Sequence, residues 1–555
     1  MDAISNFASR LSGLVWGWPD VFPLMVIALL ATGIYTTVQL RFIQVRKLKH
    51  AWDVVRGHYD DPHDKGDITH FQALTTALSA TVGIGNIAGV ATAMHYGGPG
   101  ALFWMWVTAM LGMALKYAEC TLAQRYRVIL PDGTASGGPM YSIERGLGAA
   151  WKPLAVVFAA CAVVSSFGSG NSIQAFTVAD QIRADLGVPT WITGAISASL
   201  VAAVILGGIR RIGAVTSRLV PYMAAIYVTG GLLVLLMNIT DIPRLLWLIV
   251  SSAFQPAAQI SGFAGGTFIF MLTWGVKRGL FSNEAGQGSA PIAHAAARTD
   301  EPVREGAVAL MEPLIDTLII CTITGLVILS AGVWSEKRQE VVPVNPQSAI
   351  MVVQETTRIQ ANGRVLTRDR FTGTVPVVDG RPQNVGFVRN HSLVDEPRIL
   401  MDGRPYEGRL MVVGGMVDFA ANPSLSLSGL MLQNGSPLTA WAFQRGLEPL
   451  VGRWGFLIVT VGVVLFGIST AISWSYYGDR AVVYLFGPRW VTTYKIVFCI
   501  MNFLGAIFSL EVVWNLGDSA LGLMALPNLL GLLLLSRQTR RMTDDYFSRP
   551  QVYDR

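Results

Sequence analysis

The fold is decided by the stretch Ala80-Thr81-Val82-Gly83-Ile84-Gly85-Asn86-Ile87-Ala88-Gly89, which lies inside an apolar run over residues 71–94. Such a run predicts a membrane-spanning helix, because about 20 mostly apolar residues are needed to cross a bilayer. Clustered glycines weaken a helix, and lipid does not tolerate unpaired backbone groups. The stretch therefore predicts a broken helix that lines a cavity enclosed by protein.

The composition of the whole chain also indicates a membrane protein. Of 555 residues, 52% are hydrophobic and 14% are charged, and the mean hydropathy is +0.46. Ordinary soluble domains have about 25% charged residues, and disorder requires low hydrophobicity. The four cysteines lie inside apolar runs without metal-ligand spacing, which excludes a disulfide-stapled secreted scaffold. We attribute the net charge of +6 to basic cytoplasmic loops and expect no nucleic-acid partner.

Eleven apolar runs are long enough to span a membrane. They lie near residues 21–40, 71–94, 101–123, 153–182, 190–208, 221–239, 262–281, 306–333, 453–477, 488–508 and 510–536. Residues 1–20 lack the features of a cleavable signal peptide, so we expect the first run to remain as a helix. The shorter run Arg244 to Phe254 fits either a helix lying flat at the membrane surface or part of an irregular loop.

The loops on one side of these spans are rich in basic residues, which is typical of the cytoplasmic side. The opposite side has none between His95 and Gly100 and only Arg244 near Asp241. This bias predicts a multi-pass protein of the plasma (inner) membrane with its N-terminus outside and its C-terminus in the cytoplasm. The basic residues assigned to the cytoplasmic side are Arg41, Arg46, Lys47, Lys49, Arg56, Arg125, Arg127, Arg145, Arg210, Arg211, Arg218, Lys277, Arg278, Arg298, Arg304, Arg480, Arg489, Arg537, Arg540 and Arg541.

A second interruption closes the seventh span, between Thr273 and Gly286. If the first span is an extra helix, the two breaks fall in the first and sixth of ten helices. Five helices per half invert the second half relative to the first, which is the layout of symporters with a midplane site. We therefore predict an all-α polytopic fold with a five-plus-five inverted repeat and one extra N-terminal helix. Gly85 and Gly89 also fit a GxxxG helix-packing pattern, which is compatible with a break.

Residues 336–436 interrupt this helical pattern. They are polar, and Asn362-Gly363, Asp379-Gly380 and Asp402-Gly403 suit two-residue hairpin turns. We predict a small β-rich extracytoplasmic insertion, which is either an inactive spacer or a module that binds a partner. The predicted organisation is an extra helix and cytoplasmic linker (1–70), a first five-helix repeat (71–240), the start of the second repeat (241–335), the insertion (336–436), the rest of the second repeat (437–540) and a cytoplasmic tail (541–555).

Broken helices supply binding groups without charged side chains. Free backbone N–H groups and the positive end of a half-helix favour a carboxylate. Free carbonyl and hydroxyl oxygens favour a hard cation such as sodium. An α-amino acid with a co-bound cation suits such a site.

Several long motifs resemble those of the alanine or glycine:cation symporter family, which belongs to the amino acid–polyamine–cation superfamily. They are Thr81 to Ala93, Gly97 to Trp106, Gly137 to Tyr141, Arg278 to Gly286, Gly288 to His294, Ser469-Thr470 and Trp474 to Gly478. The resemblance covers most of residues 15–335 and 437–540. It implies a sodium-coupled importer of small neutral amino acids, alanine and glycine, without enzymatic activity or organic cofactor. Members of the family have a short connection where this chain carries its insertion.

The resemblance also implies the residues of the site. The carboxylate would meet the backbone at Gly83 and Gly85, while Trp474 would cap a small pocket on the same helix face as Thr470. The polar pair Asn171 and Gln174 resembles a position that faces the substrate. The substrate-binding residues would be Thr81, Gly83, Gly85, Asn86, Gly170, Gln174, Thr273, Gly275, Thr470 and Trp474. Sodium would be held by Ala80, Gly83, Ser469 and Thr470. For any single side chain the alternative is helix packing.

Ionisable residues inside the spans suggest further roles. Lys116 and Glu119 are three residues apart, which predicts a structural ion pair. Glu312 and Asp316 are expected to brace the cytoplasmic end of the eighth span near Arg278 and are second-rank candidates for ion coupling.

Two other function classes compete with a sodium symporter. A membrane enzyme would use Glu284 or the pair Glu312 and Asp316 as acid and base, but the sequence has no nucleophile elbow and no HExxH motif. A membrane sensor would use the insertion to bind a partner. The absence of Lys and Arg between Pro221 and Asn238 favours sodium over protons, by comparison with the wider superfamily.

Overall fold

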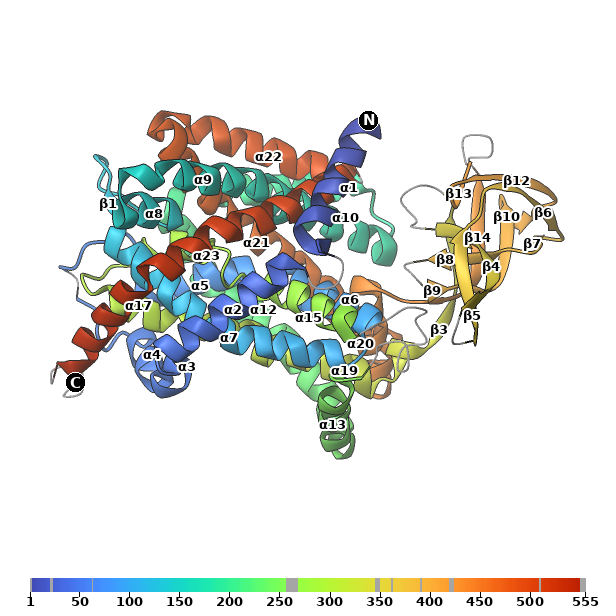
Figure 1. Cartoon of the computed structure of the whole chain (residues 1–555), viewed down its shortest axis with the longest axis horizontal. Coiled ribbons are helices and arrows are strands. Elements are labelled where there is room, and N and C mark those ends of the chain that lie inside the picture. The colour runs from blue at the N-terminus through green and yellow to red at the C-terminus, as the bar shows by residue number, and fades with distance from the viewer. Residues whose placement is uncertain are drawn as a thin grey trace.

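The computed structural model describes residues 2–19, 23–61, 63–255, 268–344, 350–360, 363–389, 392–418, 424–508 and 511–549. They form a helical body with a β-rich domain at one end (Figure 1). The start of the predicted run 262–281 and the predicted turn residue Asn362 lie outside these residues.

Each of the eleven predicted apolar runs contains a helix. Within the described residues, seven helical stretches are long and apolar enough to cross a membrane, and the bent pair of α5 and α6 makes up to eight. Leu24–Gln39 and Thr190–Ile205 are shorter apolar helices. The chain is thus a multi-pass membrane protein, while the number eleven and the inverted repeat remain predictions.

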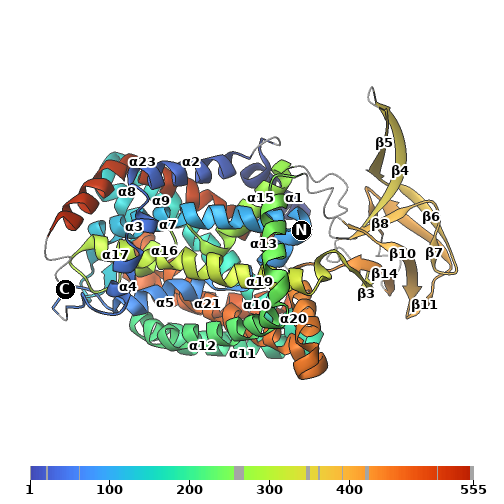
Figure 2. The same ribbon diagram turned by 90° about the horizontal axis from the view of Figure 1, so that it is seen from below.

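The helices run mostly along the long axis of the body (Figures 1 and 2). Their bounds are α1 Asp2–Gly17, α2 Leu24–Gln39, α3 Ile43–Arg46, α4 Leu48–Val55, α5 His70–Thr81, α6 Val90–Gly97, α7 Gly100–Tyr126, α8 Pro139–Leu147, α9 Lys152–Phe167, α10 Ile173–Leu186, α11 Thr190–Ile205, α12 Gly208–Met237, α13 Ile242–Ser252, α15 Phe268–Asn283, α16 Ala290–His294, α17 Pro302–Ala309, α18 Met311–Pro313, α19 Thr322–Ser330, α20 Gly435–Val451, α21 Leu457–Phe486, α22 Val491–Ile507 and α23 Glu511–Ser548. Three π-helical segments, Gly85–Gly89, Gly168–Ser172 and Leu314–Cys321, interrupt the regular hydrogen bonding.

The helix α13 confirms the helical interpretation of the run Arg244 to Phe254. It crosses the direction of the other helices in Figure 2, and the Trp247 side chain on it is exposed. Tryptophan at such a position is typical of the membrane interface.

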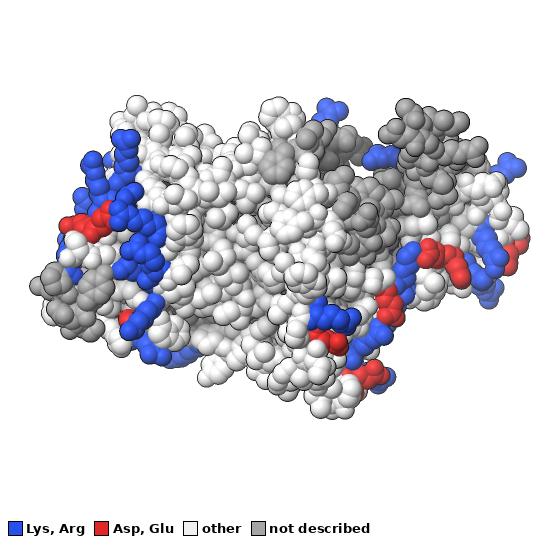
Figure 3. Space-filling view, turned by 60° about the horizontal axis from the view of Figure 1, so that its bottom comes forward, with Lys and Arg blue, Asp and Glu red and all other residues white. Residues whose placement is uncertain are grey.

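The two ends of the body differ in charge. The N-terminal helix lies at the same end as the β domain, and the C-terminal helix α23 ends at the opposite end (Figure 1). Figure 3 shows Lys and Arg side chains gathered at the C-terminal end, next to a broad band with few charged side chains. This separation agrees with the orientation expected from the basic loops, which stays a prediction.

The β domain consists of three four-stranded sheets, with strand orders β11-β10-β14-β3, β13-β12-β6-β7 and β5-β4-β8-β9. Asp379, Gly380, Asp402 and Gly403 all have positive φ, so both predicted Asp-Gly turns form. Alternating side chains such as Val352, Phe387 and Leu427 fill a core of its own. The strands are β3 Lys337–Pro343, β4 Ile350–Gln360, β5 Gly363–Arg370, β6 Gly373–Val378, β7 Arg381–Pro382, β8 Gly386–Arg389, β9 Ser392–Leu393, β10 Asp395–Met401, β11 Arg404–Pro405, β12 Gly408–Val413, β13 Met416–Val417 and β14 Leu425–Leu432, with β1 Val128–Ile129 and β2 Ala135–Ser136 in the helical body.

Two expectations about charged residues are wrong. Lys116 pairs with Glu312 at 3.0 Å rather than with Glu119, which accepts a hydrogen bond from Asn528. Glu312 contacts Lys116 and His294, and Asp316 accepts from Asn86 and Ser282, so neither carboxylate pairs with Arg278. Arg278 itself lies within the helix α15.

Candidate functional site

The first predicted break occurs where the glycines stand. The Thr69 side chain caps the start of α5, and the helix ends at Thr81. The chain resumes at Gly85 and continues into α6, so the two halves are bent by 51°. A Cβ atom on Gly83 would lie 2.6 Å from Thr470 Oγ1. Glycine is therefore required at the break by the close approach of α21.

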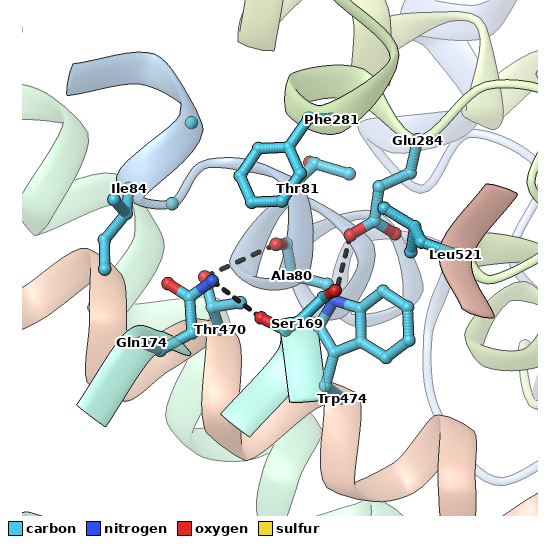
Figure 4. A pocket seen from close by; sticks show the side chains of 12 residues that line it. Ala80, Thr81, Ile84, Ser169, Gln174, Phe281, Glu284, Thr470, Trp474 and Leu521 are labelled. Atoms are coloured by element: carbon cyan, nitrogen blue, oxygen red, sulfur yellow. Dashed lines mark hydrogen bonds between the residues drawn. The ribbon is translucent and has the colours of Figure 1, made fainter. Parts of the chain in front are cut away.

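A small cavity opens beside this break (Figure 4). The non-atom space between its lining residues is about 280 Å³. The part of this space that the centre of a water molecule can reach is only about 10 Å³, about enough for one water, so a bound amino acid would require the lining side chains to move apart. The lining residues are Ala80, Thr81, Gly83, Ile84, Gly85, Ser169, Gln174, Phe281, Glu284, Thr470, Trp474 and Leu521.

Two hydrogen-bonding atoms of the cavity lack partners among the described residues. They are Gln174 Oε1 and Ser169 Oγ, which belong to residues that are only 3% exposed. The Gln174 amide is held in place because its Nε2 donates to Ser169 O at 3.0 Å. A buried polar atom left unpaired costs about 1–3 kcal/mol. Both atoms are thus available to a polar ligand.

The indole ring of Trp474 forms one wall. Its Nε1 donates to Glu284 Oε1 at 2.9 Å, and Ser289 Oγ donates to Glu284 Oε2 at 2.5 Å. A Cβ on Gly170 would lie 2.3 Å from Trp474 Cγ, so the ring rests on the π-helical segment. The indole is therefore fixed by one hydrogen bond and one tight packing contact.

Carbonyl and hydroxyl oxygens gather between α5 and α21. Thr470 Oγ1 lies 3.2 Å from Ser79 O and 3.3 Å from Ala80 O. Ser469 Oγ lies 3.4 Å from Ser79 O, and all these groups are buried. Neutral oxygen ligands of this kind suit a hard cation such as sodium. The candidate residues Ala80, Ser469 and Thr470 are thus brought together.

Asn86 lies behind the cavity rather than on its wall. Its Oδ1 accepts from Gly83 N at 2.8 Å, and its Nδ2 donates to Asp316 Oδ1 at 2.7 Å. The second oxygen of Asp316 accepts from Ser282 Oγ at 2.7 Å. Asn86 and Asp316 therefore join the broken helix to α15 and to the π-helical segment Leu314–Cys321.

The second break lies near the end of the predicted interruption, which ran from Thr273 to Gly286. Thr273 and Gly275 are inside the regular helix α15, and a Cβ on Gly275 would lie 2.6 Å from Ala101 O. Gly275 thus serves close helix packing, and neither residue lines the cavity. The chain breaks at Glu284, whose φ is +54°. Phe281 and Glu284 reach the cavity from this break, and the motif Arg278 to Gly286 was the signal for them.

A larger recess lies on the other side of Ile84 and Phe281, which line both spaces. Its non-atom space is about 1150 Å³. It is bordered by Tyr96, Arg278 and the segment Asn434–Pro437, which follows the last strand of the β domain. The small cavity is therefore separated by these two side chains from an opening at the β-domain end.

Comparison with known proteins gives one family match, two related sequences and one solved structure. The model of the sodium:alanine symporter family matches residues 1–359 and 425–553. The sodium/alanine symporter AgcS of Methanococcus maripaludis is 40% identical over 538 residues, which cover 97% of this chain and 95% of AgcS. An uncharacterized transporter of Haemophilus influenzae is 37% identical over 550 residues, covering 99% of this chain and 97% of that protein. The crystal structure of MhsT in complex with L-phenylalanine has a TM-score of 0.49 at 11% identity, over 85% of this chain and 89% of MhsT, which does not establish a shared fold.

Proposed function

The chain belongs to the sodium:alanine symporter family, and from that premise we propose that it imports small neutral amino acids, alanine and glycine, together with sodium. The family is one of transporters, so a sodium-coupled amino-acid symporter in the membrane is the function at the coarse level. A membrane sensor is not favoured. What we propose beyond this is that the substrate is alanine or glycine, and which residues bind it.

The observation that carries the proposal is the small cavity at the helix break. The unpartnered acceptors Gln174 Oε1 and Ser169 Oγ suit the ammonium group of an amino acid. The backbone at Gly85, where the second half of the broken helix begins, and the hydroxyl of Thr470 suit its carboxylate, whereas the N–H of Gly83 is already used by Asn86. The Trp474 ring limits the length of the side chain. In this assignment Asn86 holds the break in shape instead of touching substrate.

Sodium is proposed to bind beside the amino acid. The carbonyls of Ser79 and Ala80 and the hydroxyls of Ser469 and Thr470 would hold it. Thr470 contributes to both sites, so occupancy of one favours the other. Coupling between two adjacent ligands needs such a shared element.

The positions of the small cavity and the larger recess suggest from which side the amino acid enters. The amino acid would enter from the recess at the β-domain end after Ile84 and Phe281 move aside. Release on the other side would require α5 to move, because this half of the broken helix covers the cavity there. Alternation between these openings is the expected transport cycle.

The test is uptake of labelled alanine by proteoliposomes with sodium or choline outside. Uptake that needs sodium and is lost in Gln174→Ala supports the proposal. Gln181→Ala is a matched control, because Gln181 lies two turns along the same helix and bonds Asp185 at 2.7 Å. Equal uptake in choline would contradict sodium coupling, and normal uptake by Gln174→Ala would contradict the assigned site.

A further inference from the structure

Five buried ionisable side chains form a continuous chain of contacts on the far side of the break from the recess. Lys116 Nζ donates to Glu312 Oε2 at 3.0 Å, and Glu312 Oε1 lies 2.6 Å from His294 Nε2. The other ring nitrogen, His294 Nδ1, lies 2.5 Å from Glu305 Oε1. Glu305 Oε2 in turn contacts His70 Nδ1. The five side chains are at most 1% exposed.

The number of contacts fixes a minimum number of protons. Each short contact between an imidazole nitrogen and a carboxylate oxygen must share one proton, because two lone pairs repel each other. The three contacts of His70 and His294 with Glu305 and Glu312 therefore hold three protons. Two neutral histidines with two ionised glutamates hold only two. The arrangement thus contains one proton more than these groups ordinarily carry near neutral pH.

The extra proton makes the set of five contacting side chains electrically neutral. With three shared protons the two histidines and two glutamates carry a net charge of −1, which the Lys116 ammonium balances. Without the proton the set is left with an uncompensated buried charge, which is strongly unfavourable. Loss of the proton must therefore be accompanied by the loss of a contact or the entry of water.

Two further carboxyl groups, those of Glu119 and Glu284, lie close enough to act electrostatically on Lys116. Both side chains are buried, and burial disfavours their ionised forms, so the charge balance of the five residues does not depend on them. The charged or titratable groups on the elements around the five residues are Asp60, Asp64, Glu119, Cys120, Arg127, Glu284, Arg304, Asp316 and Tyr477.

The row of five contacting side chains runs from the protein interior toward water and ends at His70 on α5. His70 stands at the first position of α5, and its Nε2 is buried without a hydrogen-bond partner. That nitrogen lies 3.9 Å from Asp60 Oδ1, and the Asp60 side chain is 43% exposed. His70 is the only member of the chain carried by α5; the others belong to α7, α16, α17 and α18. A small shift of Asp60 would connect the chain to solvent.

A metal ion is a weaker explanation of the cluster. Cys120, His294 and Glu312 offer ligand atoms within 4.8 Å of one another. Both ring nitrogens of His294 already contact carboxylates, and Lys116 places a positive charge on Glu312. The groups are therefore arranged around protons.

We propose that these five residues form a proton-binding site that clasps α5 against α16 and α17, and that the clasp opens when its extra proton leaves to the cytoplasm through His70 and Asp60. The proton balances as a loss from the His294 imidazolium, relayed through Glu305 and His70 to water. Each histidine then keeps one proton, and the neutral His294 ring can donate to only one carboxylate, so its contact with Glu305 is lost. The proposal rests on the transport function proposed above. It makes protons a regulator of inward opening rather than the driving ion.

The test is alanine counterflow in proteoliposomes, with equal sodium on both sides and the external pH fixed. Raising the internal pH from about 6 to about 8, across the range of an imidazole, should speed exchange by about threefold or more. Glu305→Gln should be equally fast at both values, because an amide cannot hold the shared proton. Glu301→Gln is the matched control: Glu301 is paired with Arg549 outside the chain and should respond like wild type. His50 does not interfere, because burial and Lys47 lower its pKa to about 4.

If the purified Glu305→Gln protein does not bind alanine, that variant has failed to fold. The Asp60→Asn variant then provides the test. Asp60 is exposed, so this variant should fold. Loss of its negative charge near His70 should shift the midpoint of the internal pH response to lower pH. An unchanged midpoint, or wild-type exchange that ignores internal pH, would overturn the clasp. Absence of any alanine exchange at neutral pH would instead overturn the proposed function.

Discussion

Trp474 illustrates how single residues set the cavity size. Its ring is held by Glu284 and rests on Gly170, so in the proposed site a substrate side chain would meet a fixed wall. Replacement by leucine removes most of that wall. We expect wild type to prefer alanine and glycine strongly over leucine and the Trp474→Leu variant to narrow this gap. Competition of labelled alanine uptake by unlabelled glycine, alanine, serine, valine and leucine measures both. Equal competition by leucine in wild type would show that Trp474 does not limit substrate size.

Gly170 is expected to be intolerant of even one added methyl group. A Cβ there would lie 2.3 Å from Trp474 Cγ, and overpacking of this kind costs about 1–3 kcal/mol. Gly170→Ala should therefore reduce the apparent affinity for alanine by roughly tenfold, since 1.4 kcal/mol corresponds to that factor. Gly13→Ala is the control, because a Cβ on Gly13 would meet nothing within 4 Å. Unchanged alanine binding by Gly170→Ala would contradict the packing argument.

The hydroxyls at Ser469 and Thr470 are expected to set the sodium affinity. Their combined replacement by alanine removes two oxygen ligands and should raise the sodium concentration needed for half-maximal uptake. Ser475→Ala is a suitable control, because that buried hydroxyl donates to Ile472 O of its own helix at 2.6 Å. Uptake driven equally well by a proton gradient without sodium would refute the sodium assignment.

Individual residues show how far sequence reasoning reaches. Ala80, Gly83, Gln174, Thr470 and Trp474 line one cavity as predicted, because glycine clusters and polar residues in apolar runs are visible in sequence. Asn86 does not line this cavity, because its side chain hydrogen-bonds Gly83 and Asp316, the latter 230 residues away, and such long-range partners are not visible in the sequence. The pairing of the buried ionisable residues was predicted less well. The helical spacing of Lys116 and Glu119 suggested a local pair, but tertiary contacts brought Glu312 closer.

At the scale of elements, the two breaks differ in what their glycines do. Gly83 stands where the chain leaves the helix, whereas Gly275 stands in a regular helix against Ala101 O. Sequence cannot distinguish these uses, because a missing Cβ permits both an irregular backbone and close packing. The predicted interruption, Thr273 to Gly286, therefore contained the break at Glu284 but also included regular helix before it. The use of Gly170 in the π-helical segment Gly168–Ser172 is also a matter of packing, because the Trp474 ring lies against it.

The first broken helix depends on Asn86 for its shape. Asn86→Ala would leave Gly83 N and Asp316 Oδ1 without their partner, at about 1–3 kcal/mol for each unsatisfied group. We expect a lower unfolding temperature and weaker alanine binding, measured on the purified protein. Asn238→Ala should have little effect, because Asn238 bonds Val234 O at the end of its own helix. Unaltered stability of Asn86→Ala would show that the break is held by other contacts.

At the scale of the whole molecule, the β domain is the part for which the family match offers no role. The family model does not match residues 360–424. The Asp-Gly turns and alternating strands were predictable because turn chemistry is local, whereas the arrangement in three sheets depends on long-range pairing. The domain has its own core, but its base contacts the helical body. His95 Nδ1 lies 3.0 Å from Gln433 O, and Glu336 pairs with Arg445.

These contacts decide where the β domain can be removed. Arg338 and Met431 are paired neighbours on adjacent antiparallel strands, so a short glycine-rich turn can join them. Such a deletion keeps Glu336, Gln433 and the segment Asn434–Pro437 that borders the recess. We expect it to insert and to import alanine at a rate close to wild type, because neither helix break nor the cavity receives a residue from the removed part. A second deletion that also removes Gln433 to Ser436 should impair uptake, since it opens the wall of the recess. Loss of alanine binding in a well-expressed first deletion would place the β domain in the transport pathway itself.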